Sequence, residues 1–384
     1  MESYLDNSAT TVCSKRATDM VVRLLTEDYG NPSAMHQKGV IAENYIKDAK
    51  QKIASTLKVD EKEIYFTSGG TESNNMALIG ASLANKRAGM HIITTGIEHA
   101  SIYATTEFLK EQGFEITYLP VDKDGLVDLD ALSDALREDT ILVSVMQVNN
   151  EIGAVEPIDE IAKIVHKKSK NAIFHVDAIQ SYGKMIIRPR KSGIDMLSVS
   201  GHKIHGPKGS GFLYIRDKVK MKPLILGGGQ QKGMRSGTEN VPAYCGLAEA
   251  ATEMYENFEE NIEHLWNLKN RFIEGVQKID GCSVNGKTDM TSAPHIVSVS
   301  VDGVRSEVLL HSLESENVYV SAGSACSSNK PAVSRTLKAI NLNPKLLDST
   351  IRFSFSVHTT EEEIDYALSV MGEVVPKLRK YVRR

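Results

Sequence analysis

Two short apolar runs that end in polar side chains constrain the fold of this chain more than any other feature. The first run, Phe174 to Val176, is followed by Asp177, and the second, Met196 to Val199, leads into the stretch Ser-Gly-His-Lys that ends at Lys203. Such runs are typical of buried parallel strands, and open α/β sheets bind ligands at the carboxyl edge of their strands. We therefore expect Asp177 and Lys203 to lie at one ligand-binding edge.

Asp177 and Lys203 together suggest one chemistry in particular. A lysine can form an imine with pyridoxal phosphate, and an aspartate can pair with the pyridinium nitrogen so that the ring withdraws electrons. Each residue also has a simpler interpretation, because lysines are common in solvated turns and aspartates often cap the element that follows a strand. The interpretation therefore depends on what the rest of the chain supplies.

The segment around Gly69 and Gly70 predicts a phosphate site. An apolar run at 64–67 predicts a strand, residues 68–75 form a Gly-rich loop, and Met76, Ile79 and Leu83 then recur at helical spacing. A strand, a Gly-rich turn and a helix start turn free backbone N–H groups toward an anion. The loop lacks the spacing of a dinucleotide fingerprint or a nucleotide P-loop, which argues against NAD and ATP.

Apolar runs and helical patterns alternate through the first two thirds of the chain. Further strands are predicted at 91–95, 115–119 and 141–146, and helices at 40–57, from 101, at 129–136, 158–166 and 242–255. This alternation predicts a mostly parallel sheet covered by helices on both faces. Beyond 255, strands at 296–301 and 351–355 with helices at 262–279 and 364–378 predict a smaller α/β domain. We therefore predict a large domain at 15–255 and a small domain formed by 1–14 and 256–384.

Length, charge and cysteine spacing exclude several classes of protein. At 384 residues the chain exceeds the usual size of one domain, and its net charge of -4 gives no general attraction to nucleic acid. The basic residues after position 376 are better explained as a solvated helix end than as an RNA-binding tail. Four scattered cysteines fit neither a disulfide framework nor a metal site, and no run reaches membrane-spanning length. We therefore expect a cytoplasmic protein that does not bind membranes.

Ten motifs, in order, resemble those of cysteine desulfurases of the NifS/IscS type. These enzymes belong to the class V branch of fold-type I pyridoxal phosphate enzymes, and the resemblance extends over essentially the whole chain. It implies a mostly parallel seven-stranded sheet in the large domain, a smaller α/β domain, and a homodimer. Small departures are Ser8, where Ala is common, Gln231, where Glu is frequent, and the composition of the loop after Cys326. The motifs occupy residues 4–11, 29–33, 67–75, 98–99, 148–153, 175–180, 200–203, 235–238, 323–327 and 351–354.

The resemblance implies a role for each matching residue at the ring of pyridoxal phosphate. Lys203 would form the imine and move protons, and Asp177 would pair with the pyridinium nitrogen. His99 would stack on the ring and exchange protons. Gln180 would hydrogen-bond the ring hydroxyl oxygen, and Asn150 would lie near the ring and the substrate.

At the two ends of the site, the resemblance implies anion recognition. The phosphate would bind Gly70, Thr71, Ser200 and His202, together with Thr238 from a second subunit. Arg352 would bind the carboxylate of L-cysteine through its planar guanidinium, which offers two parallel N–H donors.

Cys326 decides which reaction the resemblance implies. A thiolate on a Gly- and Ser-rich loop can take sulfur from bound cysteine, leaving alanine and a persulfide. Lys330 could favour that thiolate. The other three cysteines, Cys13, Cys245 and Cys282, are expected to be small buried apolar side chains.

Three alternatives remain open from the sequence. The first is a selenocysteine lyase, and the second is a non-catalytic protein that holds cofactor or sulfur for a partner. The third is a metal site formed by His99, His202 and His205, which lacks a matched Cys or carboxylate spacing. For the desulfurase itself, the sulfur acceptor also stays open: an iron–sulfur scaffold, a tRNA-thiolating enzyme or a thiamin-pathway carrier.

Overall fold

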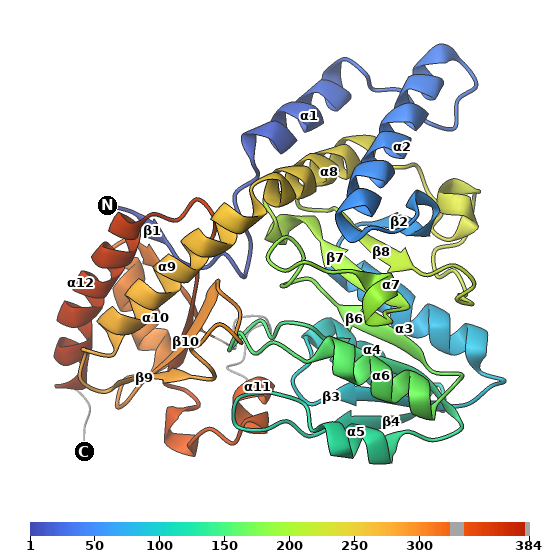
Figure 1. The fold of residues 1–384 in the computed structure, drawn as a ribbon. Coiled ribbons are helices and arrows are strands. Elements are labelled where there is room, and N and C mark those ends of the chain that lie inside the picture. Colours follow the sequence, from blue (N-terminus) through green and yellow to red (C-terminus); the bar gives the residue numbers. More distant parts are fainter. Residues whose placement is uncertain (323–333, 381–384) are drawn as a thin grey trace.

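A seven-stranded sheet forms the centre of the larger part of the molecule (Figure 1). The computed structural model describes residues 1–322 and 334–380. The strand order is β2-β8-β7-β6-β5-β3-β4, and only β8 runs against its neighbours. The predicted mostly parallel sheet is therefore confirmed, with β8 as an unpredicted strand. The strands are β2 (Ile64–Thr67), β3 (His91–Thr95), β4 (Glu115–Leu119), β5 (Thr140–Met146), β6 (Ile173–Asp177), β7 (Met196–Ser200) and β8 (Gly211–Ile215).

Helices cover both faces of this sheet because its strands are apolar on both sides. In β5, Val143 and Val145 pack toward α2, α6 and α8, whereas Leu142 packs toward α3 and α4. Helix α1 lies outside this layer, against α8 (Figure 1). The helices are α1 (Lys15–Thr26), α2 (Gln37–Leu57), α3 (Gly70–Asn85), α4 (Ala100–Glu111), α5 (Leu129–Ala135), α6 (Ile158–Lys168), α7 (Pro189–Ser192) and α8 (Val241–Glu256).

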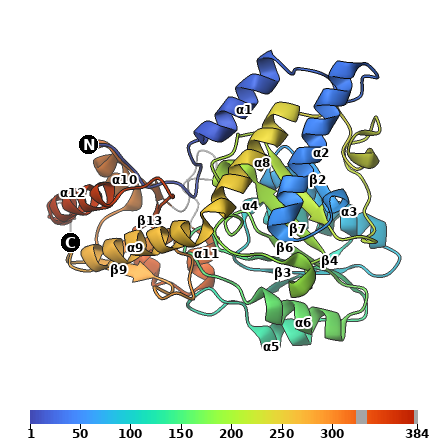
Figure 2. The ribbon, with the colours of Figure 1, turned by 45° about the horizontal axis from the view of Figure 1, so that its top comes forward.

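A second, smaller core surrounds a four-stranded sheet of order β12-β13-β10-β9, antiparallel throughout. Helix α9 begins directly after α8 and leads from the larger part of the molecule into this smaller part (Figure 2). The strands are β9 (Cys282–Asn285), β10 (Ile296–Val301), β12 (Ser321–Ala322) and β13 (Thr350–Ser354), and the helices are α9 (Phe258–Val276), α10 (Ser306–Glu314), α11 (Arg335–Ala339) and α12 (Glu361–Arg379).

The N-terminal arm packs on the smaller core. Strand β1 (Ser3–Tyr4) pairs in parallel with β11 (Val318–Tyr319), and Leu5 is fully buried in the smaller core. Asp6 then forms an isolated bridge with Ser354 at the end of β13. The arm therefore crosses between the two cores, although the boundaries drawn from the sequence at 14 and 255 stay a prediction.

The expectation of three buried cysteines is confirmed for one of them. Cys245 on α8 is buried, whereas Cys13 and Cys282 are only partly buried. Cys13 lies in the irregular arm and Cys282 begins β9, at the edge of the small sheet, where packing is one-sided. Cys326 and the neighbouring Lys330 lie outside the described residues. Within 1–322 and 334–380, no helix is long and apolar enough to cross a membrane.

Candidate active site

A cavity of about 350 Å³ lies at the carboxyl edge of the large sheet and also reaches β12 and β13 of the small one. It collects the polar residues that follow β3, β5, β6 and β7. The site residues predicted from the sequence therefore meet here, apart from Thr238, while Cys326 lies outside the described residues. Those lining the cavity are Gly70, Thr71, His99, Asn150, Asp177, Gln180, Ser200, His202, Lys203 and Arg352.

Asp177 is a buried carboxylate at the end of β6. Its Oδ2 accepts a hydrogen bond from Asn74 Nδ2 at 2.8 Å, and its Oδ1 accepts from the backbone N–H of Ile179 at 3.0 Å. Burial raises the pKa of Asp177, against these hydrogen bonds and the attraction of His99 and Lys203. A buried carboxylate of this kind is well suited to pair with a cationic N–H inside the cavity.

His99 caps the start of α4. Its Nδ1 accepts from the backbone N–H of Ser101 at 3.1 Å and lies 2.9 Å from the Ser101 hydroxyl. Burial lowers the pKa of His99 despite the nearby carboxylate of Asp177. The imidazole is therefore mostly neutral near pH 7, which leaves it able to accept a proton.

Lys203 ends the 3₁₀ turn η2 (Gly201–Lys203), immediately after β7. Its Nζ donates to the backbone carbonyls of Ser8 at 2.5 Å and Ala9 at 2.7 Å. The N-terminal arm thus holds the amine at the cavity wall, and Ser8 and Ala9 themselves line the cavity. The motif at 4–11 includes these two residues, but its sequence indicates no role for them, since the contact joins segments nearly 200 positions apart.

The phosphate cradle predicted at the start of α3 is formed by two glycines. Gly69, the N-cap, has φ of 146°, a conformation that favours glycine. A Cβ on Gly70 would lie 2.3 Å from Ile179 Cδ1. The bare backbone at the helix start therefore faces the cavity, where its N–H groups and the helix dipole favour an anion.

Two residues beside the cradle extend the anion-binding end. Ser200 ends β7, and His202 lies in η2, with its Nδ1 3.2 Å from the Thr10 hydroxyl. Burial, with a further contribution from Lys203, lowers the pKa of His202 to about 4. His202 therefore contributes as a neutral hydrogen-bonding group. Thr238 is exposed and does not line the cavity.

Arg352 lies at the centre of β13 and reaches the cavity from the smaller core. Its Nη2 donates to Asp6 Oδ1 at 2.7 Å, and its Nη1 donates to the backbone carbonyl of Asn150 at 2.8 Å. The guanidinium is thereby oriented with donors to spare, which suits it to bind a carboxylate.

Two contacts hold the side-chain amide of Gln180 in place. Its Nε2 donates to the carbonyl of Ser8 at 3.0 Å, and its Oε1 lies 3.4 Å from Nε2 of the buried His295. Asp6, Asn74 and His295 are thus functional neighbours that the sequence did not reveal, because each acts on a partner distant along the chain. His205, by contrast, is absent from the cavity lining, and its Nδ1 contacts the carbonyl of Val12.

Comparison with known proteins gives one consistent result. The sequence pattern of the aminotransferase class-V family matches residues 3–367. A cysteine desulfurase IscS of Methanosarcina thermophila is 43% identical over 376 residues, which cover 98% of this chain and 92% of that protein. A solved NifS-like protein superposes with a TM-score of 0.93 at 37% identity, covering 98% of this chain and all of the other. SspA, solved in complex with cysteine, superposes with a TM-score of 0.78 at 33% identity, covering 93% of this chain and all of SspA.

Proposed function

This chain belongs to the aminotransferase class-V family, among the cysteine desulfurases of the NifS/IscS type, and we propose that it removes sulfur from L-cysteine. The products are L-alanine and a persulfide on Cys326. The observation that carries this proposal is the single cavity that gathers an amine, a buried carboxylate, an imidazole and a guanidinium, from Lys203, Asp177, His99 and Arg352.

The cavity fits pyridoxal phosphate. Gly69 and Gly70 leave the backbone at the start of α3 bare for a phosphate, a Cβ on Gly70 would meet Ile179, and Asp177 offers a buried acceptor for the pyridinium N–H. Gln180 and Asn150 would hold the ring and the substrate. When bound, the cofactor supplies an electron sink for bond changes at the substrate α-carbon.

The proposed roles of the chain's own residues follow from their positions. Lys203 Nζ, held by the carbonyls of Ser8 and Ala9, takes the α-proton and returns a proton to the product. His99, whose pKa is lowered by burial, accepts a proton at its imidazole. Arg352 binds the substrate carboxylate and thereby sets the orientation of the α-carbon.

Sulfur transfer is assigned to Cys326. Its thiolate attacks the substrate sulfur and forms an S–S bond, while the C–S bond breaks and its electron pair stays with the carbon that becomes the alanine methyl group. A proton completes that methyl group, so no external oxidant is needed. The persulfide then passes its outer sulfur to an acceptor protein, either an iron–sulfur scaffold or a thiolation enzyme. Cys326 lies four positions beyond Ala322, and Ser321 lines the cavity.

We further propose a cytoplasmic homodimer in which Thr238 completes the phosphate site of the neighbouring subunit. Two observations support this arrangement. Thr238 is exposed and is not part of its own cavity. The cradle also opens on a hollow of about 460 Å³ that shares Gly70, Thr71 and Ser200 with the cavity.

The test is anaerobic incubation of the purified protein with L-cysteine and a reducing thiol, with alanine and sulfide measured together. We expect equal amounts of both products from the native protein. Cys326→Ser should keep the visible band of the bound cofactor and stop sulfide release, Lys203→Ala should abolish the band, and Cys13→Ser serves as a matched control. Full sulfide release from Cys326→Ser would refute the persulfide step, and a strong preference for selenocysteine would favour a selenocysteine lyase.

A further inference from the structure

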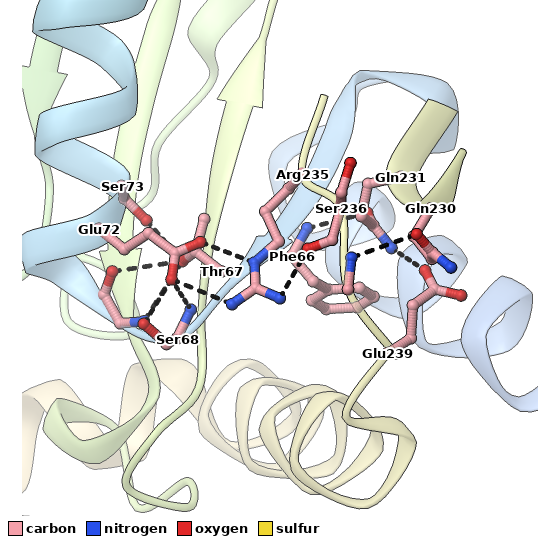
Figure 3. Close-up of polar contacts among 12 residues, drawn as sticks. Phe66, Thr67, Ser68, Glu72, Ser73, Gln230, Gln231, Arg235, Ser236 and Glu239 are labelled. Atoms are coloured by element: carbon pink, nitrogen blue, oxygen red, sulfur yellow. Dashed lines mark hydrogen bonds and ion pairs between the residues drawn. The ribbon is translucent and has the colours of Figure 1, made fainter. Parts of the chain in front are cut away.

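An ion pair joins the phosphate cradle to the loop that follows the 3₁₀ turn η3 (Gln230–Gly233) (Figure 3). Arg235 Nε donates to Glu72 Oε1 at 2.9 Å, and Arg235 Nη2 donates to Glu72 Oε2 at 3.4 Å. The exposed fractions of the two side chains are 20% for Arg235 and 14% for Glu72. Salt therefore screens this pair less than it screens a fully exposed one.

Glu72 braces the turn that forms the cradle. Its Oε2 accepts from the backbone N–H of Ser68 at 3.1 Å and from the Ser68 hydroxyl at 2.5 Å. The N-cap Gly69 has no side chain with which to cap the helix. Glu72, in the first turn of α3, therefore stabilises the preceding backbone much as the Glu of a capping box does.

The same carboxylate lies where it can oppose an anion. Glu72 lines the open hollow beside the cavity, together with Gly70 and Thr71 of the cradle. Burial raises the pKa of Glu72, but hydrogen bonds from Arg235 and Ser68 outweigh it, so the pKa lies below its usual value. Glu72 is thus ionised near pH 7, and without Arg235 it would repel a phosphate that carries nearly two negative charges.

The loop that presents Arg235 is tied to the large sheet. Gln231 Oε1 accepts from the backbone N–H of Phe66 on the edge strand β2 at 3.1 Å, and Gln231 Nε2 donates to Glu239 (Figure 3). Ser236 Oγ donates to the carbonyl of Gly228 at 2.7 Å. Arg235 is therefore held beside Glu72 by a braced segment.

We propose that Arg235 is a positioning residue for phosphate binding: it neutralises Glu72, so that this carboxylate can brace the turn from Ser68 to Thr71 without repelling the anion. The inference rests on the proposed function, because it takes the phosphate of pyridoxal phosphate as the anion. It concerns affinity for the phosphorylated cofactor, separately from chemistry at Lys203.

The experiment compares two probes, pyridoxal phosphate and pyridoxal, which differ only in the phosphate. Each is titrated into cofactor-free full-length protein, and binding is followed by the change in visible absorbance when the aldehyde binds. Arg235→Met should weaken pyridoxal phosphate about tenfold, as expected for one charge-assisted interaction, and change pyridoxal by less than about twofold. The double variant Glu72→Gln/Arg235→Met should return to within about threefold of the native affinity, because neither charge remains.

The control is Arg137→Met, which breaks an exposed pair with Glu115 at the opposite edge of the sheet and should leave both affinities unchanged. An equal loss of pyridoxal and pyridoxal phosphate in Arg235→Met would overturn the inference, as would a double variant as weak as Arg235→Met. If the native protein binds neither probe, the proposed function itself fails. If instead the native protein binds pyridoxal phosphate and the variants bind it equally well, only the role of Arg235 is refuted.

Discussion

Replacing Arg352 by lysine tests whether its planar guanidinium binds the substrate carboxylate. In the native protein Nη2 donates to Asp6 and Nη1 donates to the carbonyl of Asn150, while the side chain is only 8% exposed. A lysine ammonium keeps the charge but cannot offer two parallel N–H donors. One lost charge-assisted hydrogen bond is worth about 1.5–3 kcal/mol, which corresponds to a rise in the KM for cysteine of about 10- to 150-fold.

The assay is the initial rate of alanine formation over a range of cysteine concentrations. We expect kcat to stay within about threefold, because a contact that is equally strong in the ground state and the transition state changes KM alone. Cysteine methyl ester, which has no carboxylate, should respond little to the substitution. Arg305→Lys is the matched control, since the Arg305 side chain is 65% exposed and forms a surface ion pair with Glu307. A fall in kcat with unchanged KM would refute the reasoning.

Two other substitutions test the groups around the cavity. Burial raises the pKa of Glu98 to about 8, so this carboxyl lowers the stability of the native protein as pH rises from 4.5 toward 8, and Glu98→Gln lacks that contribution. The free energy of unfolding of Glu98→Gln minus that of the native protein, measured in urea, should increase from about pH 5 to about pH 8, and a flat difference would contradict the raised pKa. Gly70→Ala places a Cβ 2.3 Å from Ile179 Cδ1 and should weaken binding of pyridoxal phosphate, measured by titration. Gly372→Ala is the control: its Cβ meets open space on α12, so it should stabilise the protein by about 0.5–1 kcal/mol. Retained affinity for pyridoxal phosphate in Gly70→Ala would argue against the cradle.

The large sheet was predictable because its strands and helices carry strong local patterns. The strands 91–95 and 115–119 have the predicted bounds, and the helix predicted at 158–166 extends to Lys168. Strand β8 was missed although its residues, 211–215, are apolar. Its place depends on antiparallel pairing with β2 and β7, and β2 lies far away in the sequence.

The candidate site was predictable to the extent that parallel strands must share one carboxyl edge. Asp177 ends β6, whereas His99 and Lys203 follow β3 and β7, so one sheet was enough to bring them together. Contacts that reach the site from elsewhere could not be inferred. Asp6, on the N-terminal arm, contacts Arg352 of β13. Arg235, on the loop after η3, contacts Glu72 of α3.

The sequence by itself thus determined the chemistry offered by each segment: apolar runs set the strands, glycines set the cradle, and the polar residues after each strand set the reactive groups. Only the tertiary structure decided which groups meet across the two cores, as Arg352 of β13 meets the backbone of Asn150 beyond β5. The physical reason is that side-chain periodicity acts over a few neighbouring residues. The pairing of distant segments depends instead on how complete surfaces pack and on which buried charges find partners.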